Sequence, residues 1–338
     1  MSARPLAIGA AAIAAWLLGT GFACAETTAA PPQPVAERIA EGVWLIPGGM
    51  LPKRQPDGNT ILFGAGRARF VVMDTGRHAW HRAAILDFVR ARHGTIVAIV
   101  NSHWHLDHVS GNPELKRAFP DARVYASRAI DSALTGFLAR SVESSRQYLE
   151  PGKLPPETQE DIRNDIATIE NGAKLRPDVP VDGSLSISFG RRVLRLNLAR
   201  DAATAGDVWV YDAAARTAVV GDLVTLPAPF LDTACPEGWR RALAQIAASP
   251  FIALVPGHGA RMDRGQFATY RAAFEGLLDC AGSARSKTEC AEAWTQSVTP
   301  LLGPDPGERR RSQAMTEYYV AEVLRANGGK SAYCGHGG

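Results

Sequence analysis

The residues with the clearest chemical potential lie at positions 103–108, where the chain reads His-Trp-His-Leu-Asp-His. The imidazoles of His103, His105 and His108 and the carboxylate of Asp107 are ligand types that zinc and other first-row metals prefer. Four such groups in a protein interior would repel one another or stay unpaired unless a cation lay between them. The spacing therefore predicts a metal site rather than a run of surface histidines.

Two further ligand types stand apart in the sequence, each after an apolar run. Asp222 follows the run 218–220 and Gly221, and His258 lies just beyond the run 251–255. Taken singly, such an aspartate is more often a turn or cap residue, and a lone histidine is more often a hydrogen-bonding core residue. Because the cluster at 103–108 is present as well, we expect both side chains to join the same site.

These side chains require strands that end at one edge of a sheet. The β-branched run 96–100 precedes the histidine cluster and predicts a buried strand, and α/β folds place ligand sites at the carboxyl ends of strands. Further strands are expected at 42–46, 60–63, 69–73, 124–126, 184–189, 192–198, 207–211, 218–220 and 251–255. Helices are expected at 80–92, 112–119, 238–248, 264–278, 290–297 and 308–326, with a helical insertion around 128–176. This order predicts an α/β protein with two sheets packed face to face and helices outside, in a single domain over 37–338.

Taken together, the motifs resemble those of the metallo-β-lactamase superfamily. The resemblance extends over roughly Ile39 to Arg261, and it is carried by the segments His103-x-His105-x-Asp107-His108, Asp74-Thr75-Gly76, Gly221-Asp222 and Pro256-Gly257-His258-Gly259. It implies a four-layer αββα sandwich of the metallo-β-lactamase type, with one or two zinc ions at one edge of the paired sheets. It also implies hydrolysis by a metal-bound hydroxide.

The resemblance implies a role for each ligand type. The implied metal ligands are His103, His105, Asp107, His108, Asp222 and His258. His103 and His105 would hold a first metal, and Asp107, His108 and His258 would hold a second. Asp222 would bridge the two metals. Asp107 would also orient the nucleophile, which makes it the predicted catalytic residue. Asp74 would steady the histidine loop through hydrogen bonds, a common way of tuning a metal site.

One segment departs from the family pattern. The third histidine of the first metal is expected in a His-Thr-x-Gly-Asp segment, but here Ala203 stands at that position, and alanine has no ligand atom. Asp201 is near enough in sequence to be considered as a substitute. We therefore expect one tightly bound Zn²⁺ at the second position and a weaker or absent ion at the first, with iron and manganese as alternative metals.

The function predicted on these grounds is metal-dependent hydrolysis of an ester, lactone, thioester or amide-type small molecule. A β-lactamase is one alternative, and a catalytically weak metal-binding accessory protein with a degenerate first site is another. Met50, Leu51 and Trp104 are candidates for an apolar wall beside the metal, although ordinary packing explains them equally well. The net charge of +3 is too small to argue for nucleic acid or an anionic membrane, and the sequence indicates no oligomeric state.

The first 25 residues have the features of a cleaved secretory signal peptide. Arg4 gives a positive start, 6–18 is apolar, and Ala23-Cys24-Ala25 fits a cleavage site. A short linker is expected at 26–36. We therefore expect a periplasmic or secreted protein without stable membrane insertion, while a lipid anchor at Cys24 is the alternative.

Four cysteines remain after such a cleavage, an even number that suggests two disulfides in an exported chain. Three pairings are possible. Cys280 and Cys290 flank a short helix-breaking stretch, which favours a bridge between two helices. Cys235 would then pair with Cys334 and tie the C-terminal part to the body.

Overall fold

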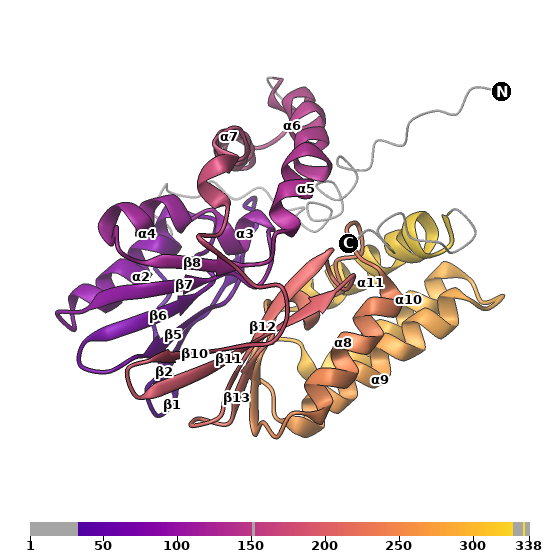
Figure 1. Ribbon diagram of the computed structural model, residues 1–338. Helices are drawn as coiled ribbons and strands as arrows, with labels where there is room; N and C mark the ends of the chain where they lie inside the picture. The colour runs from indigo at the N-terminus through magenta and orange to yellow at the C-terminus, as the bar shows by residue number, and fades with distance from the viewer. Residues whose placement is uncertain (1–32, 151–152, 327–333, 335–338) are drawn as a thin grey trace.

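The structure is a computed structural model that describes residues 33–150, 153–326 and 334. The predicted signal peptide and most of the predicted linker lie outside the described residues. Two sheets face each other between two groups of helices, and a third group of helices stands over one edge of the sheets (Figure 1). None of the helices in the described ranges combines the length and the apolar character that a membrane span requires.

The first sheet, in the order β1-β2-β5-β6-β7-β8-β9, is antiparallel from β1 to β6 and parallel from β6 to β9. Its strands are β1 (Glu37–Ala40), β2 (Val43–Ile46), β5 (Thr60–Gly64), β6 (Arg69–Met73), β7 (Thr95–Val100), β8 (Arg123–Ala126) and β9 (Val179–Pro180). The strand β1 was not predicted. Neither was the small ribbon of β3 (Gly49–Met50) and β4 (Pro56–Asp57), which lies where the sequence suggested a loop.

The second sheet has the order β10-β11-β12-β13-β14, and only its last pair, β13 with β14, is parallel. Its strands are β10 (Leu185–Phe189), β11 (Arg192–Arg200), β12 (Gly206–Asp212), β13 (Thr217–Val219) and β14 (Ala253–Val255). The parallel pairing of β13 and β14 brings their carboxyl ends to the same edge.

The main core lies between the two sheets. Val71 and Met73 of β6 and Leu194 and Leu196 of β11 belong to one buried cluster with side chains from both sheets. The residue between the first two, Val72, belongs instead to a cluster that includes the helix α2. Because alternate residues of β6 are buried on opposite faces, the strand reads as a continuous apolar run.

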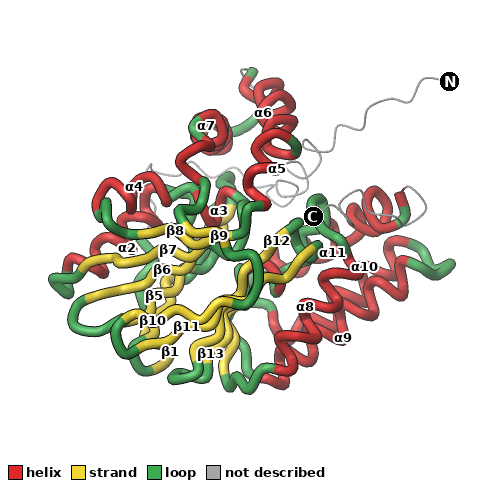
Figure 2. Tube along the Cα trace, viewed as in Figure 1, coloured by secondary structure: helices red, strands yellow, loops and turns green. Residues whose placement is uncertain are grey.

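Helices cover the outer face of each sheet (Figure 2). The first sheet packs against α2 (Ala79–Arg90) and α4 (Asn112–Ala118). The second sheet packs against α8 (Pro236–Ala248) and α9 (Arg264–Ala281). The helix α10 (Lys287–Val298) packs on α9 and on α11 (Pro306–Tyr319), and both extend the same apolar cluster. Short helical segments after these are η4 (Thr299–Leu301) and η5 (Val320–Leu324). The result is the predicted αββα sandwich.

The predicted helical insertion contains α5 (Ala129–Thr135), α6 (Phe137–Arg146), η1 (Gln147–Leu149), α7 (Pro156–Glu170) and η2 (Gly172–Leu175). Its buried side chains, such as Ile130, Leu138 and Leu175, form a separate small cluster with Trp104 and Leu106 of the histidine loop. The insertion is therefore packed directly onto the loop that carries the predicted ligands.

The C-terminal helices start at side-chain caps. Ser286 and Glu289 form a capping box that opens α10, so this helix begins at Lys287, three residues before its predicted start. The predicted disulfide pairing is confirmed, with bridges between Cys235 and Cys334 and between Cys280 and Cys290.

Candidate metal centre

The six predicted ligands come from three loops at one edge of the paired sheets. The loop after β7 and the short helix α3 (Leu106–Val109) carry four of them, Asp222 lies in η3 (Gly221–Leu223) after β13, and His258 follows β14. The Gly257 amide donates to the Gly221 carbonyl at 2.7 Å, which joins the last two loops. Glycine is required at both positions, since Gly221 has φ +52° and a Cβ at Gly257 would lie 2.0 Å from Asp222 Oδ1.

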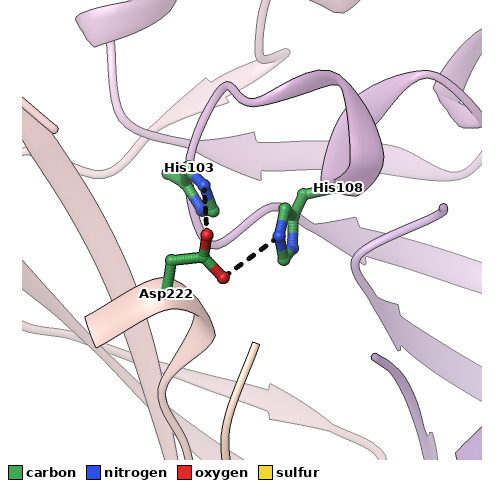
Figure 3. A group of neighbouring side chains, drawn as sticks. All are labelled: His103, His108 and Asp222. Carbon is green, nitrogen blue, oxygen red and sulfur yellow. Dashed lines mark ion pairs between the residues drawn. The ribbon is translucent and has the colours of Figure 1, made fainter. Parts of the chain in front are cut away.

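Two overlapping groups of these side chains have ligand atoms close enough to hold a cation. In the first group, Asp107 Oδ2 lies 2.9 Å from His258 Nε2 and 3.6 Å from His108 Nε2. In the second group, Asp222 lies between His103 and His108, as Figure 3 shows, with separations of 3.6 Å to His103 Nε2 and 3.2 Å to His108 Nε2. The second group is buried, and the first is buried except for His258, which is half-buried.

His105 lies beside the second group. Its Nδ1 is 2.8 Å from His103 Nε2 and 4.0 Å from Asp222 Oδ2. All six predicted ligands therefore converge on one cluster.

Asp74 sets the orientation of two of the histidine rings. Its Oδ2 accepts a hydrogen bond from His108 Nδ1 at 2.8 Å and another from the Ser102 hydroxyl at 2.7 Å. Because Ser102 Oγ has given its only hydrogen to Asp74, it accepts one from His103 Nδ1 at 2.9 Å. The Nε2 atoms of His103 and His108 are thus the ones left to face the cluster, which is the supporting role predicted for Asp74.

Thr233 orients the third ring. Its hydroxyl donates to the backbone carbonyl of Ala203 at 2.9 Å, so at 3.0 Å it accepts a hydrogen bond from His105 Nε2. His105 therefore presents Nδ1 to the cluster. The structure thus places Thr233 between His105 and the residue that stands where the family pattern has its third histidine.

The chemistry of this donor set fits a cation. His103 Nε2 and His105 Nδ1 face each other at 2.8 Å, and in neutral rings oriented in this way both atoms have lone pairs that repel. Burial and the neighbouring His108 and His105 lower the pKa of His103 well below its usual value, so this ring is neutral. The buried His108 Nε2 and Asp222 Oδ1 make no hydrogen bond either, although they are 3.2 Å apart. A positive ion among these atoms would relieve the repulsion between His103 and His105 and would give His108 Nε2 and Asp222 Oδ1 a partner.

Asp201 does not belong to either group of candidate ligands in the described residues. It lies just after β11, where its carbonyl packs against Gly238 of α8. Ala203 is buried, with 1% of its surface exposed, and its carbonyl is used by Thr233. The alternative in which Asp201 replaces the missing histidine therefore receives no support from the geometry.

Sequence reasoning did not identify Ser102, Thr233 or Arg77 as parts of the site. Ser102 could have been found, because it directly precedes His103. Thr233 is 128 residues from its partner His105, and Arg77 lies 3.7 Å from Asp107 while it also pairs with Asp165 of α7. Neither residue is part of a recognisable motif, so only the fold shows its role.

A cavity opens from the ligand cluster toward the helical insertion. His105, Asp107, Asp222 and His258 line one end of it. Of the three residues proposed as an apolar wall, Trp104 lines this cavity, but Met50 and Leu51 do not. Those two belong to the β3–β4 ribbon and the turn after β3.

Comparison with known proteins supports the same assignment. The family model described as the metallo-beta-lactamase superfamily matches residues 55–275. A metallo-beta-lactamase from Pontibacter korlensis superposes with a TM-score of 0.52 at 17% identity, covering 72% of this chain and 99% of that one. The DIM-1 metallo-beta-lactamase gives a TM-score of 0.51 at 14% identity, covering 72% and 98%. At such low identity these structures establish the fold alone.

Two curated relatives match over shorter stretches. An atrochrysone carboxyl ACP thioesterase of Passalora fulva is 38% identical over 63 residues, 19% of each chain. The lactamase-like protein vrtG of Penicillium aethiopicum is 41% identical over 71 residues, 20% of this chain and 22% of the relative. The chain thus spans about a fifth of the length of these relatives. From the family match over residues 55–275, together with the αββα fold, the chain belongs to the metallo-β-lactamase superfamily.

Proposed function

We propose that the protein is an exported metal-dependent hydrolase that cleaves an ester, lactone, thioester or amide-type bond, with zinc as its cation. Most proteins of the superfamily are hydrolases that bind metal ions, usually zinc. The observation that carries the proposal is the set of facing ligand atoms at the sheet edge, where His103, His105 and His108 turn their free nitrogens toward Asp222.

In this proposal His103, His105, Asp107, His108, Asp222 and His258 hold the metal. When bound there, a zinc ion supplies Lewis acidity and lowers the pKa of water toward about 7. Asp74 keeps the rings of His103 and His108 in the required orientation, directly or through Ser102. Thr233 does the same for His105.

Asp107 is suited to orient the attacking water. Burial opposes its ionisation, but His108, His258 and Arg77 together lower its pKa far below the usual value. The group therefore stays a carboxylate that can accept a hydrogen bond. Its Oδ1 lies 3.7 Å from Arg77, and its Oδ2 lies 2.9 Å from His258.

Export is supported by the leader-like segment 1–25 and by the two disulfides, which are typical of oxidising compartments. Expression of the full chain in a Gram-negative host, followed by N-terminal sequencing of the periplasmic fraction, tests it. We expect a mature chain that starts at Glu26. A lipidated Cys24 at the new terminus would instead establish the anchor, and an intact Met1 in the cytoplasm would contradict export.

A second candidate is an accessory protein that binds metal but turns over poorly. The observation that favours it is Ala203, which leaves His103 and His105 without a third histidine. A β-lactamase is a further alternative within the hydrolases, because the structural neighbours are named as metallo-beta-lactamases.

The deciding experiment is elemental analysis of the purified protein, followed by a hydrolysis screen with and without a chelator. The panel contains p-nitrophenyl esters, an acyl lactone, an acyl thioester, a p-nitroanilide and a chromogenic cephalosporin. We expect hydrolysis of at least one of these, loss of it with chelator, and recovery with Zn²⁺. Hydrolysis that survives chelation would rule out the metal-dependent reaction, and bound metal without any hydrolysis would favour the accessory protein. His258→Asn should abolish activity, whereas the matched change His93→Asn, at an exposed position outside the site, should not.

A further inference from the structure

The cavity beside the metal centre has an apolar interior, and the helical insertion supplies much of it. Leu138 and Val142 of α6 and Ile166 and Ile169 of α7 line it, and all of them lie in the segment 128–176. The whole cavity, including the end lined by the candidate metal ligands, has a volume of about 160 Å³. An apolar protein cavity of about 150 Å³ holds benzene, so the part beside the ligands has room for an apolar group of up to about six carbons.

Aromatic rings flank the passage from the metal ligands to this interior. Trp104 packs against Phe137 with ring centroids 5.6 Å apart, and it packs edge-on against His105 at 4.6 Å. On the other flank of His105, Phe230 packs edge-on at 4.9 Å. A substrate carbonyl at the ligand cluster would therefore have its attached chain enclosed by apolar surface.

The cations that line the cavity are already paired with carboxylates. Arg54 lies 2.6 Å from Asp161 and 2.7 Å from Glu160. Arg77 pairs with Asp165 and lies near Asp107. Among the described lining residues, no arginine or lysine is left over for an anionic group that enters the apolar part of the cavity.

We propose that this cavity binds the uncharged, apolar acyl chain of an ester or thioester substrate, about six carbons long. The inference rests on the proposed hydrolytic function and specifies its substrate class. Burial of a chain gains about 0.8 kcal/mol for each methylene, which corresponds to about a fourfold gain in affinity. A carboxylate at the same place would lose its hydration without gaining a cationic partner.

Binding can be measured without hydrolysis. Methyl ketones from 2-butanone to 2-decanone contain a carbonyl and an alkyl chain but no bond that the protein could hydrolyse. Titration of the full chain, followed by tryptophan fluorescence, should show the dissociation constant falling about fourfold for each added carbon up to about six, and then levelling off. Dissociation constants that do not change with chain length would overturn the inference.

Two variants should change, in opposite directions, the chain length at which the dissociation constant levels off. Val142→Phe fills the cavity from α6 and should shift the levelling-off point to shorter ketones. Phe137→Ala enlarges the cavity and should shift it to longer ones. Val193→Phe, the same kind of change on β11 at a side chain that is 49% exposed, serves as the matched control and should leave the profile unchanged. If Val142→Phe does not fold, Phe137→Ala alone decides, since an unchanged profile in it would contradict the assignment.

The hydrolysis of p-nitrophenyl esters from acetate to decanoate separates this inference from the proposed function. If the ketones bind with the expected profile but no ester, lactone, thioester, anilide or cephalosporin of the panel is cleaved, the hydrolase proposal fails and the binding site stands. If esters are cleaved with no dependence on chain length, or a carboxylate-bearing cephalosporin is cleaved more efficiently than every ester, the acyl-chain site is wrong. Agreement between the ester and ketone profiles supports both.

Discussion

The two halves of the candidate metal centre differ in completeness. We call Asp107, His108 and His258 the complete half, because every ligand that the family pattern implies is there. We call His103 and His105 the depleted half, because Ala203 stands where its third histidine is expected. Asp222 lies between the halves, with Oδ1 3.2 Å from His108 and Oδ2 3.6 Å from His103.

The hydrogen bonds that orient the histidine rings are present in both halves. In the complete half, Asp74 fixes His108 by a direct hydrogen bond. In the depleted half, Ser102 fixes His103 and Thr233 fixes His105, so both rings still turn the correct nitrogen inward. A site that had only decayed would have no need of this arrangement, so the comparison favours a weak but usable metal position in the depleted half.

The largest expected effect separates the halves by removing one ligand from each. His258→Ala should weaken binding of the tighter metal ion by more than about 100-fold, because removing even a residue that only supports a ligand costs about 10–100-fold. His105→Ala should leave that ion in place. Competition with a chromophoric chelator measures both affinities. Equal losses in the two variants would show that the halves do not differ as described.

Asp74→Asn tests the residue that supports both halves. Oδ2 of Asp74 accepts hydrogen bonds from His108 Nδ1 and the Ser102 hydroxyl, and Oδ1 accepts one from the Ser102 backbone N–H. An amide accepts at only one of these two atoms, so it cannot keep all three hydrogen bonds. We expect about 10–100-fold weaker metal binding, with the complete half affected most. Asp131→Asn on α5, at a half-buried residue that pairs with Arg176, is the matched control. Wild-type affinity in Asp74→Asn would show that the rings are held by other contacts.

The side chains that converge at the candidate metal centre were predictable from the sequence, but the residues that orient them were predictable only in part. The cluster 103–108 is contiguous, and Asp222 and His258 each follow a strand whose apolar run is readable. Asp74 was found through its family motif. Thr233 and Arg77 were not, because their partners lie far away in the chain and a lone threonine or arginine has no distinctive spacing.

The secondary structure was also predictable only in part. Strands that are buried on both faces, such as β6 and β7, were predicted almost to the residue. The strand β1 was missed because its sequence, Glu-Arg-Ile-Ala, is half exposed and pairs only with β2. The helical insertion was recognised, but nothing in its polar periodicity indicated that its apolar side chains would line a cavity beside the metal centre.

Thr233→Val tests the hydrogen bond that orients His105 in the depleted half. The change keeps the shape of the side chain but removes the hydroxyl that accepts from His105 and donates to Ala203. We expect about tenfold weaker binding of the metal ion in the depleted half and an unchanged affinity for the ion in the complete half. Thr233→Ser keeps the hydroxyl and should restore the affinity. A loss in both variants would point to packing instead of the hydrogen bond.

The smallest expected effect is a gain from Ala203→His, which would supply the missing ligand. A third imidazole should strengthen the second metal equivalent, but Ala203 is buried, and forcing a larger side chain into a packed site costs about 1–3 kcal/mol. The net improvement should therefore be less than about tenfold and accompanied by a lower melting temperature. Metal titration measures the gain in affinity, and thermal unfolding of the same preparations measures the loss of stability. If the melting temperature falls but the second equivalent binds no better, position 203 does not face the depleted half, and the comparison between the halves would need another explanation.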